Sequence, residues 1–355
     1  MNRYLLDTWY VAAWSSELSP GEVLGRTLLE TPVALFRKAD GTAAAVLDRC
    51  PHRFAPLSAG RVDQGRLLCG YHGLGFDGGG ACVLNPHGPT LASLAIPAWP
   101  TVEAHHAIWI WFGVANKADP GLIPDLSFLT TAPATAFSAG MLTGKGHYEL
   151  YVDNLMDLSH TDYLHPDTLG GGAVTKARPK VVETAEHIEV TSFAPDTPPS
   201  PLLRKLFPDL PAQTDFWQRV RWVAPGVMKL TAATGAAGGA EGDAMVNTNA
   251  HIVTPETATS SHYFFAATRN FHVDDGDLNA VIATKRAEIF ATEDGPMLAK
   301  VQDRMGDAEF WSLAPKLLAI DAAPVAVRRR MKAMVEAEAE RSLHCTNDLK
   351  TKVRS

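Results

Sequence analysis

The chain has 355 residues, with 32 basic and 39 acidic side chains and a formal net charge of −7. This length predicts two domains or one large one, and a composition of 46% hydrophobic and 20% charged residues is typical of a globular protein. The pI is near 6.0 and the longest uninterrupted run of Lys and Arg is only three residues, Arg328-Arg329-Arg330, which argues against a nucleic-acid-binding protein. There is no apolar run of 18 residues and no signal-peptide core, and only four cysteines occur, so we expect a soluble cytoplasmic protein without a membrane anchor.

The first third of the chain predicts a small antiparallel β domain. Short apolar or alternating segments stand at 32–37, 43–47 and 106–112. Turn sequences such as Gly78-Gly79-Gly80 separate them, which is typical of closely spaced strands. A polar stretch with two prolines follows at 114–124 and is the best candidate for a linker. We therefore predict two domains, 1–118 and 119–355.

Beyond the linker, the sequence predicts both helices and strands. Helical spacing of apolar residues occurs over 148–163, ending at His165-Pro166, over 277–304, and over 323–341. Strands are expected at 180–183, 188–191, 220–223, 250–253 and 260–265. Because strands and helices are segregated rather than strictly alternating, the pattern favours an α+β fold.

Cysteine and histidine recur together in two short segments of the predicted β domain. Cys50 and His52 form the first pair, and Cys69 and His72 form the second. A zinc finger normally takes its two cysteines from one loop and its two histidines from the other. One thiolate and one imidazole from each loop instead suit a two-iron cluster, in which the cysteines bind one iron and the histidines the other. The alternatives are a structural zinc site, or buried thiols beside unrelated histidines.

Five segments carry a family resemblance. They are Trp9–Trp14, Cys50–Leu57, Cys69–Leu74, Val152–His160 and Thr254–Thr257. On these residues the chain resembles the Rieske non-haem iron oxygenases, and in particular the monooxygenase branch that contains dicamba monooxygenase and vanillate demethylase oxygenases. The resemblance implies an N-terminal Rieske [2Fe-2S] β domain. It also implies a helix-grip catalytic domain, an antiparallel sheet with helices, that holds a mononuclear non-haem iron.

Candidate ligands for that iron follow the linker. His160 and His165 are five residues apart, about 140° around an ideal helix, so a regular helix would not direct both at one ion. Pro166 disfavours helical geometry at His165 and lets the chain turn there. Two histidines and one carboxylate leave open positions on Fe(II) for oxygen chemistry. The resemblance implies that the carboxylate is Asp294, with Glu293 as the weaker candidate. Considered alone, the two histidines would more often be ordinary histidines and Asp294 a solvated aspartate. The Cys/His motif upstream favours ligand roles for the histidines, whereas the support for Asp294 comes mainly from the resemblance.

Asp157 and Asn154 are further catalytic candidates. Asn154, Asp157 and His160 are spaced three residues apart and share one face of the predicted helix. The Asp157 carboxylate could orient the His160 imidazole through its free N–H. The resemblance implies a larger role, in which Asp157 bridges the iron-ligating histidine to His72 of a neighbouring subunit in a homotrimer. The alternative is a solvated or helix-capping aspartate.

Two residues are weaker candidates for substrate binding. His251 begins a predicted strand and matches a substrate-pocket histidine of the dicamba branch, although a core or surface histidine is nearly as well supported. Lys285 stands where that branch has a pocket tryptophan, and Leu230 replaces a pocket asparagine. These two differences argue against dicamba itself as the substrate.

Together, the motifs and the resemblance predict the terminal oxygenase of a multicomponent Rieske monooxygenase. Electrons from NADH would arrive through a separate reductase, with or without a ferredoxin, because this chain has no nicotinamide or flavin fingerprint. We expect O-demethylation of a methoxylated, vanillate-like aromatic acid with O2. Hydroxylation of an aryl methyl group or ring is the alternative reaction. A Rieske electron carrier without its own chemistry is the non-enzymatic alternative.

Overall fold

The chain folds into two compact units. The computed structural model describes residues 3–352, with side chains through residue 341. One unit comprises Met1–Ile123 with Ala333–Ser355, and the other comprises Pro124–Lys332. The first unit thus takes in a C-terminal segment that the predicted domain 119–355 places in the second, and the boundary after residue 118 stays a prediction. Within the described residues, no helix combines the length and hydrophobicity needed to cross a bilayer.

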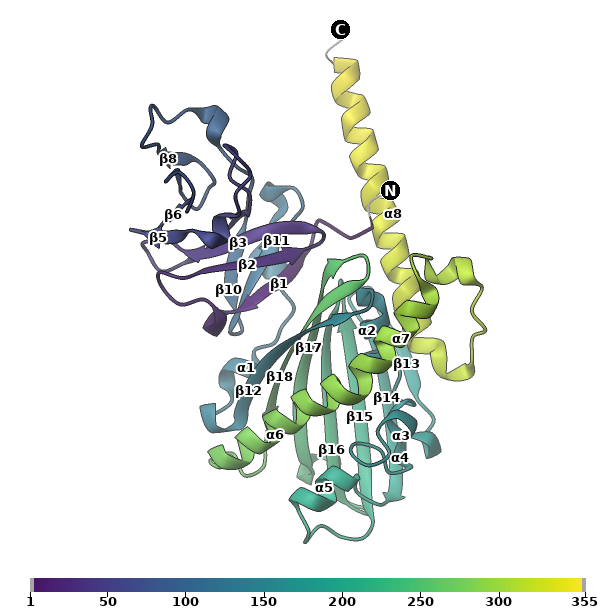
Figure 1. Ribbon diagram of the computed structural model, residues 1–355. Coiled ribbons are helices and arrows are strands. Elements are labelled where there is room, and N and C mark those ends of the chain that lie inside the picture. The colour runs from purple at the N-terminus through teal and green to yellow at the C-terminus, as the bar shows by residue number, and fades with distance from the viewer. Residues whose placement is uncertain (1–2, 353–355) are drawn as a thin grey trace. The chain divides into compact units, whose positions relative to one another are not determined.

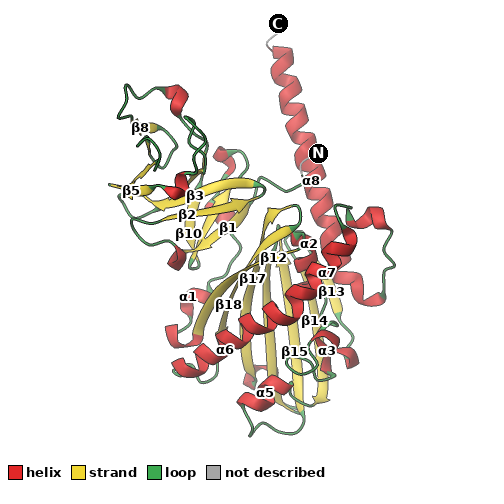
Figure 2. Ribbon diagram, in the orientation of Figure 1, coloured by secondary structure: helices red, strands yellow, loops and turns green. Residues whose placement is uncertain are grey.

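Residues 3–123 of the first unit are built from strands, turns and short 3-10 helices (Figure 2). Its strands form three antiparallel sheets. In sheet order these are β1 (Trp9–Trp14), β11 (Ala107–Trp111) and β10 (Thr101–Ala104); β2 (Val23–Leu28), β3 (Thr31–Arg37), β4 (Ala43–Leu47) and β9 (Ala98–Trp99); and β5 (Arg61–Asp63), β6 (Arg66–Leu68), β7 (Gly75–Phe76) and β8 (Cys82–Leu84). Every residue of β1 and β11 is buried, as expected for continuous apolar runs.

The second unit contains one large antiparallel sheet with a long helix across one face (Figure 1). The seven strands, in sheet order, are β12 (Phe137–Lys145), β18 (Ser260–Arg269), β17 (Met245–Thr257), β16 (Val227–Ala236), β15 (Thr214–Val223), β14 (Ile188–Thr197) and β13 (Lys180–Glu183). The helix is α6 (Gly276–Ile289), which continues through a π-helical turn (Phe290–Asp294) into α7 (Gly295–Met305). The predicted α+β fold is confirmed.

The remaining helices are mostly short. They are α1 (Phe128–Thr131), α2 (Tyr148–Met156), α3 (Thr161–Leu164), α4 (Ala173–Lys176), α5 (Pro201–Leu206) and α8 (Ala322–Lys352). The single helix predicted over 148–163 is wrong, because α2 ends before Asp157. There the Asp157 carboxylate accepts the backbone N–H of Ser159 at 2.8 Å, and this local bond competes with helical hydrogen bonding.

Candidate metal centres and substrate cavity

Two loops of the first unit have the same backbone hydrogen-bond pattern. In each, the cysteine N–H donates to the carbonyl five residues later, and the cysteine carbonyl accepts the N–H four residues later. The first loop begins at Cys50 and the second at Cys69. The fourth residue after the cysteine has a positive φ in both, +60° at Phe54 and +74° at Gly73. The chain therefore presents its two Cys/His pairs on two copies of one turn.

The side chains of these loops fit the donor set of a Rieske cluster. Cys50 and Cys69 are only 1% and 2% exposed, and neither forms a disulfide. The imidazole rings of His52 and His72 lie 4.6 Å apart between centroids. Burial raises the pKa of the Cys50 thiol, whereas the backbone N–H of His52 that donates to it lowers the pKa. Such N–H donors stabilise the sulfur ligands of iron–sulfur clusters.

A second donor set lies in the other unit. His160, His165 and Asp294 each offer a ligand atom, and these atoms lie within 4.8 Å of one another. Asp294 Oδ1 is 3.5 Å from His160 Nε2 and 3.2 Å from His165 Nε2. Two imidazoles and one carboxylate on one side of an ion leave other coordination positions open, which is the ligand set of non-haem Fe(II) oxygenases. The residues present therefore fit a mononuclear iron.

The break in the predicted helix positions both histidines. His160 precedes the single turn of α3, and His165 follows it, with a backbone that is no longer helical (φ −118°, ψ 43°). Pro166 accounts for that departure, because proline disfavours helical geometry in the residue before it. The chain thus brings together two imidazoles that a regular helix would separate by about 140°.

Asp294 owes its position to the π-helical turn. The N–H of Gly295 donates to the carbonyl of Phe290, five residues earlier, instead of four. Pro296 follows immediately and has no N–H to continue the regular pattern. The wider turn shifts the helix phase at Asp294, which is 5% exposed. Single π-turns of this kind often occur at functional sites.

Neighbouring groups hold both imidazoles by their Nδ1 atoms. His160 Nδ1 lies 2.5 Å from the backbone carbonyl of Asp157, and His165 Nδ1 hydrogen-bonds to Glu293 Oε2. Thr168 Oγ1 also donates to that Glu293 oxygen, at 2.9 Å. Bonds of this kind fix the ring orientation and leave Nε2 free for a metal.

These contacts revise three sequence-based expectations. It is the carbonyl of Asp157, not its carboxylate, that orients His160; the carboxylate instead accepts two hydrogen bonds from Ser159. Glu293, the weaker ligand candidate, lies on the Nδ1 side of His165 and is outside the donor set. Asn154 Nδ2 donates to Asp294 Oδ1 at 3.0 Å, so this amide orients the carboxylate.

The electrostatics of the donor set also suit a cation. Burial alone would raise the pKa of the Asp294 carboxyl, but the His160 and His165 imidazoles hold it well below its ordinary value. Burial lowers the pKa of His165, yet Asp294 and Glu293 raise it more, so that it lies above the ordinary value. Asp294 is therefore a carboxylate at neutral pH, as a metal ligand must be.

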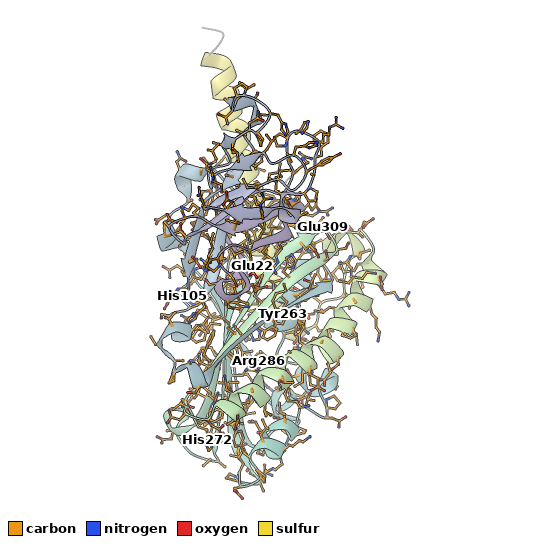
Figure 3. All side chains as sticks on the ribbon, turned by 60° about the vertical axis from the view of Figure 1, so that its left-hand side comes forward. Glu22, His105, Tyr263, His272, Arg286 and Glu309 are labelled. Atoms are coloured by element: carbon orange, nitrogen blue, oxygen red, sulfur yellow. The ribbon has the colours of Figure 1, made fainter. Side chains whose placement is uncertain are left out.

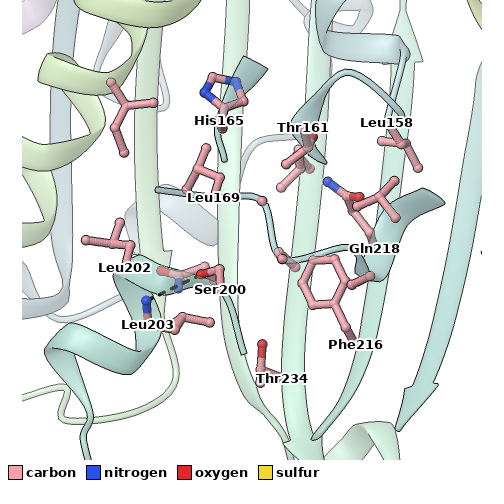
Figure 4. A pocket seen from close by; sticks show the side chains of 18 of the residues that line it. Leu158, Thr161, His165, Leu169, Ser200, Leu202, Leu203, Phe216, Gln218 and Thr234 are labelled. Atoms are coloured by element: carbon pink, nitrogen blue, oxygen red, sulfur yellow. Dashed lines mark hydrogen bonds between the residues drawn. The ribbon is translucent and has the colours of Figure 1, made fainter. Parts of the chain in front are cut away.

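A cavity of about 280 Å³ adjoins this donor set. Alternate residues of β15, β16 and β17 line one side, as the register shows for the row Gln218, Ala232 and Asn247. Figure 4 shows Gln218 on that side, Leu203 of α5 across from it, and His165 above them. The cavity is thus mostly apolar with a few polar groups, as small-molecule sites commonly are.

The two substrate-binding candidates differ in position. His251 lines the cavity, and its Nδ1 lies 2.5 Å from the Tyr263 hydroxyl. Lys285 is not among the residues that line the cavity, and its ammonium pairs with Glu288 at 2.7 Å on the same helix, so a substrate-binding role for Lys285 stays a prediction without support from this geometry. Because each residue turns a helix by about 100°, the cavity-facing side chain is the next one, Arg286.

Sequence reasoning missed Arg286, although a signal was present. Ile282, Arg286, Ile289 and Phe290 have the i, i+4, i+7, i+8 spacing of one helix face, and all four line the cavity. A lone cation on an otherwise apolar helix face is unusual in a core. Arg286 could therefore have been predicted as a cavity residue once it was known which side of the helix faces the cavity.

Comparison with known proteins agrees with this geometry. Residues 8–97 match the Rieske [2Fe-2S] domain, and residues 145–337 match the vanillate O-demethylase oxygenase C-terminal domain. These two domains in this order define the oxygenase components of Rieske non-haem iron monooxygenases. The chain belongs to this family, in the vanillate O-demethylase oxygenase branch.

The similarity to individual relatives extends over nearly the whole chain. The dicamba O-demethylase oxygenase component of Stenotrophomonas maltophilia is 39% identical, covering 95% of this chain and 99% of that one. The chloroacetanilide N-alkylformylase oxygenase component of Rhizorhabdus wittichii is 38% identical, covering 94% and 97%. A crystal structure of dicamba monooxygenase bound to dicamba superposes with a TM-score of 0.87 at 38% identity, covering 95% and 99%. The predicted family is confirmed.

Proposed function

We propose that the protein O-demethylates a methoxylated aromatic acid, as the terminal oxygenase of a multicomponent system. The observation that carries this proposal is the cavity: its walls are largely apolar, and His160, His165 and Asp294 line it. A flat aromatic ring suits such walls, and a methoxy group could then approach the metal position. Insertion of one oxygen atom into a methoxy C–H bond gives a hemiacetal, which collapses to a phenol and formaldehyde.

In this reaction the chain's own residues would bind the substrate and keep the metal ligands in place. When bound at His160, His165 and Asp294, Fe(II) supplies the activation of O2. Asn154, Glu293 and the Asp157 carbonyl keep the three ligand side chains in place through hydrogen bonds. The apolar walls exclude water and hold the substrate.

Electrons would come from NADH through a separate reductase, with or without a ferredoxin. The family relatives named above are described as oxygenase components, which supports a separate electron donor. Cys50, His52, Cys69 and His72 would hold the [2Fe-2S] cluster that receives these electrons. We also propose a cytoplasmic location, because NADH is available there.

We further propose that the working unit is a homotrimer in which Asp157 faces His72 of a neighbouring subunit. In the described part of the chain, Ser159 donates twice to Asp157 Oδ1, and no hydrogen bond reaches Oδ2. One carboxylate oxygen therefore remains available for an imidazole N–H. The measurement is the mass of the purified oxygenase in solution, for which we expect three chains.

The test of the activity is NADH-dependent turnover of a panel of methoxybenzoates with a surrogate reductase. We expect equal amounts of formaldehyde and phenol, measured by mass spectrometry. An Asp294→Asn variant that keeps its cluster absorption but makes neither product is the matched control. Turnover of no methoxybenzoate, although the cluster is reduced, would contradict the proposal.

Hydroxylation of an aryl methyl group is the second candidate, since the same insertion occurs at a C–H bond without the ether oxygen. Relatives described as toluene-4-sulfonate monooxygenase subunits, 33–34% identical over 84–85% of this chain, favour including it. Methylbenzoates and toluene-4-sulfonate in the same panel would distinguish the two reactions by their hydroxymethyl products. The electron-carrier alternative is wrong, because residues 145–337 match the catalytic domain of the family.

A further inference from the structure

Arg286 is a cation in a largely apolar cavity. It lies on α6 and lines the cavity together with Ile282 and Phe290 of the same helix and π-turn (Figure 3 labels Arg286 and Tyr263). Among the residues that the structure describes, it is the only Lys or Arg lining this cavity. The cavity-facing side of this helix is otherwise apolar, and Arg286 thus places a permanent charge on it.

We propose that Arg286 binds the anionic group of the substrate, a carboxylate or a sulfonate, and thereby fixes which end of the substrate faces the metal ligands. This inference rests on the proposed function and deepens it, because it names the residue that recognises the acid. Arg286 is a binding residue that sets specificity, separate from the ligands of the metal.

The guanidinium lacks a counter-ion in the described part of the chain. Its one hydrogen bond there runs from Nη1 to the Ser138 hydroxyl at 3.2 Å, and no Asp or Glu forms an ion pair with it. Burial lowers the pKa of Arg286 to about 10, so the group remains charged at neutral pH. A partly buried cation without a counter-ion is costly, and an anionic ligand would supply that counter-ion in a two-bond geometry.

The other candidate for binding the acid cannot supply charge. His251 is buried, and burial, followed by the nearby Arg286 charge, lowers the pKa of its imidazole to about 3. His251 is therefore neutral at physiological pH and can offer only a neutral hydrogen bond. Arg286 is thus the group that could distinguish an acid from its neutral analogue.

Amide groups on β17 line the same cavity as this cation. Asn249 is 6% exposed, lines the cavity, and its side chain makes no hydrogen bond to other described residues. Asn247 and His251 lie two residues before and after it, on the same face of the strand. An amide that lines a cavity without a protein partner is available to a ligand or to water. These groups suit the remaining oxygens of a bound acid.

Along the helix, Arg286 lies some distance from Asp294, so the site that would bind the acid group is separate from the metal ligands. It precedes Asp294 by eight residues, about 12 Å along the axis at 1.5 Å per residue. The acid group would be held at one end of the cavity, and the methyl group presented toward His160, His165 and Asp294 at the other. Substrate orientation would therefore follow from the acid's position on the ring.

The experiment compares Arg286→Met with Arg286→Lys, using Lys285→Met as the matched control. Met keeps a long side chain without charge, Lys keeps the charge, and Lys285 is the neighbouring cation outside the cavity. For a methoxybenzoate that the parent enzyme demethylates, Arg286→Met should raise KM by about 10- to 100-fold, the effect of a lost charge-assisted hydrogen bond. KM for the matching methoxybenzamide should change little, Arg286→Lys should be intermediate, and Lys285→Met should behave like the parent.

Calorimetric binding of benzoate and benzenesulfonate to the full oxygenase tests, without turnover, whether Arg286 is the anchor, that is, the residue that binds the acid group. Both anions should lose affinity in Arg286→Met, and preference for one of them identifies the acid class. If no methoxybenzoate reacts with the parent enzyme but anion binding depends on Arg286, the proposed reaction fails and the anchor stands. Equal losses for the acid and the amide, or unchanged anion binding in Arg286→Met with an intact cluster spectrum, would overturn the anchor.

Discussion

The two metal centres use the chain in different ways. The candidate cluster ligands lie between residues 50 and 72, on two loops that repeat one hydrogen-bond pattern, and both cysteines belong to one buried apolar cluster. The candidate iron ligands come from the two ends of α3 and from a π-turn 129 residues after His165. Each iron-site side chain is held by a different neighbour. A centre built on local loops is specified by a short motif, whereas a dispersed centre depends on how the whole unit folds.

This difference predicts that each centre can be removed without the other. Replacement of His52 or His72 by Ala should give the largest effect, because a cluster iron loses a ligand: the visible absorption of the oxidised cluster and all turnover should disappear. Absorption spectroscopy and iron analysis of the purified variants measure this. A normal spectrum with full cluster iron in both variants would show that these histidines are not ligands.

Replacement of His160 or His165 by Ala should also abolish turnover, but the cluster spectrum should survive. Iron should fall by about one atom per chain, because the remaining two donors no longer hold Fe(II) firmly. Metal analysis beside the absorption spectrum measures both centres in one sample. Loss of the cluster with retention of the mononuclear iron would mean that the two sites have been exchanged.

Asp157→Asn tests whether the two centres communicate between subunits. Asn keeps the volume of Asp and can accept a hydrogen bond, but it lacks the charge that favours an N–H-donating or protonated imidazole. We expect both metal sites, the proposed trimer and substrate binding to be kept, while steady-state turnover is almost lost. Rapid mixing of the dithionite-reduced protein with substrate and O2 should show slow or absent cluster reoxidation. Reoxidation at the parental rate would assign Asp157 a structural role at the end of α2.

The same contrast explains how far the sequence could predict the sites. The cluster motif is local, so the spacing of its cysteines and histidines indicates the chemistry by itself. Asp294 is predicted only through the family resemblance, because nothing in a charged helical segment indicates that a π-turn will direct one carboxylate inward. Helix phase sets a further limit: Lys285 and Arg286 are neighbours, and a difference of one residue turns a side chain by about 100°, which decides which of the two faces the cavity.

Asp157 shows a second limit of sequence reasoning. Its spacing from His160 correctly brings the two residues into contact, but a pattern cannot tell a carboxylate from a backbone carbonyl. The carboxylate bonds to Ser159, ends α2 and leaves the carbonyl to orient the imidazole. Competition between a side chain and the helix backbone decides such details, and it depends on local geometry.

Glu293→Gln probes the dispersed centre with a smaller change. The carboxylate that orients His165 becomes a neutral amide of similar size, and Thr168 can still donate to it. Iron should bind about 10- to 100-fold more weakly, and added Fe(II) should restore much of the turnover. Glu288→Gln, on the exposed side of α6, is the control and should bind iron normally. Loss of activity that iron cannot restore would contradict a role limited to orienting the ligand.

The smallest expected effect is a change in thermal stability when the equivalent positions of the two cluster loops are substituted. Phe54 and Gly73 occupy equivalent positions with positive φ, and only glycine adopts that conformation without strain. Relief of about 1–2 kcal/mol in Phe54→Gly, reduced by about 0.5–1 kcal/mol of added chain entropy, should modestly stabilise the first loop. Gly73→Ala should have the opposite sign, because its new Cβ would lie 3.2 Å from Pro86 in a strained backbone. The temperature at which cluster absorption is lost should therefore rise in the first variant and fall in the second. A fall in both would mean that the exposed Phe54 ring makes contacts that outweigh its backbone strain.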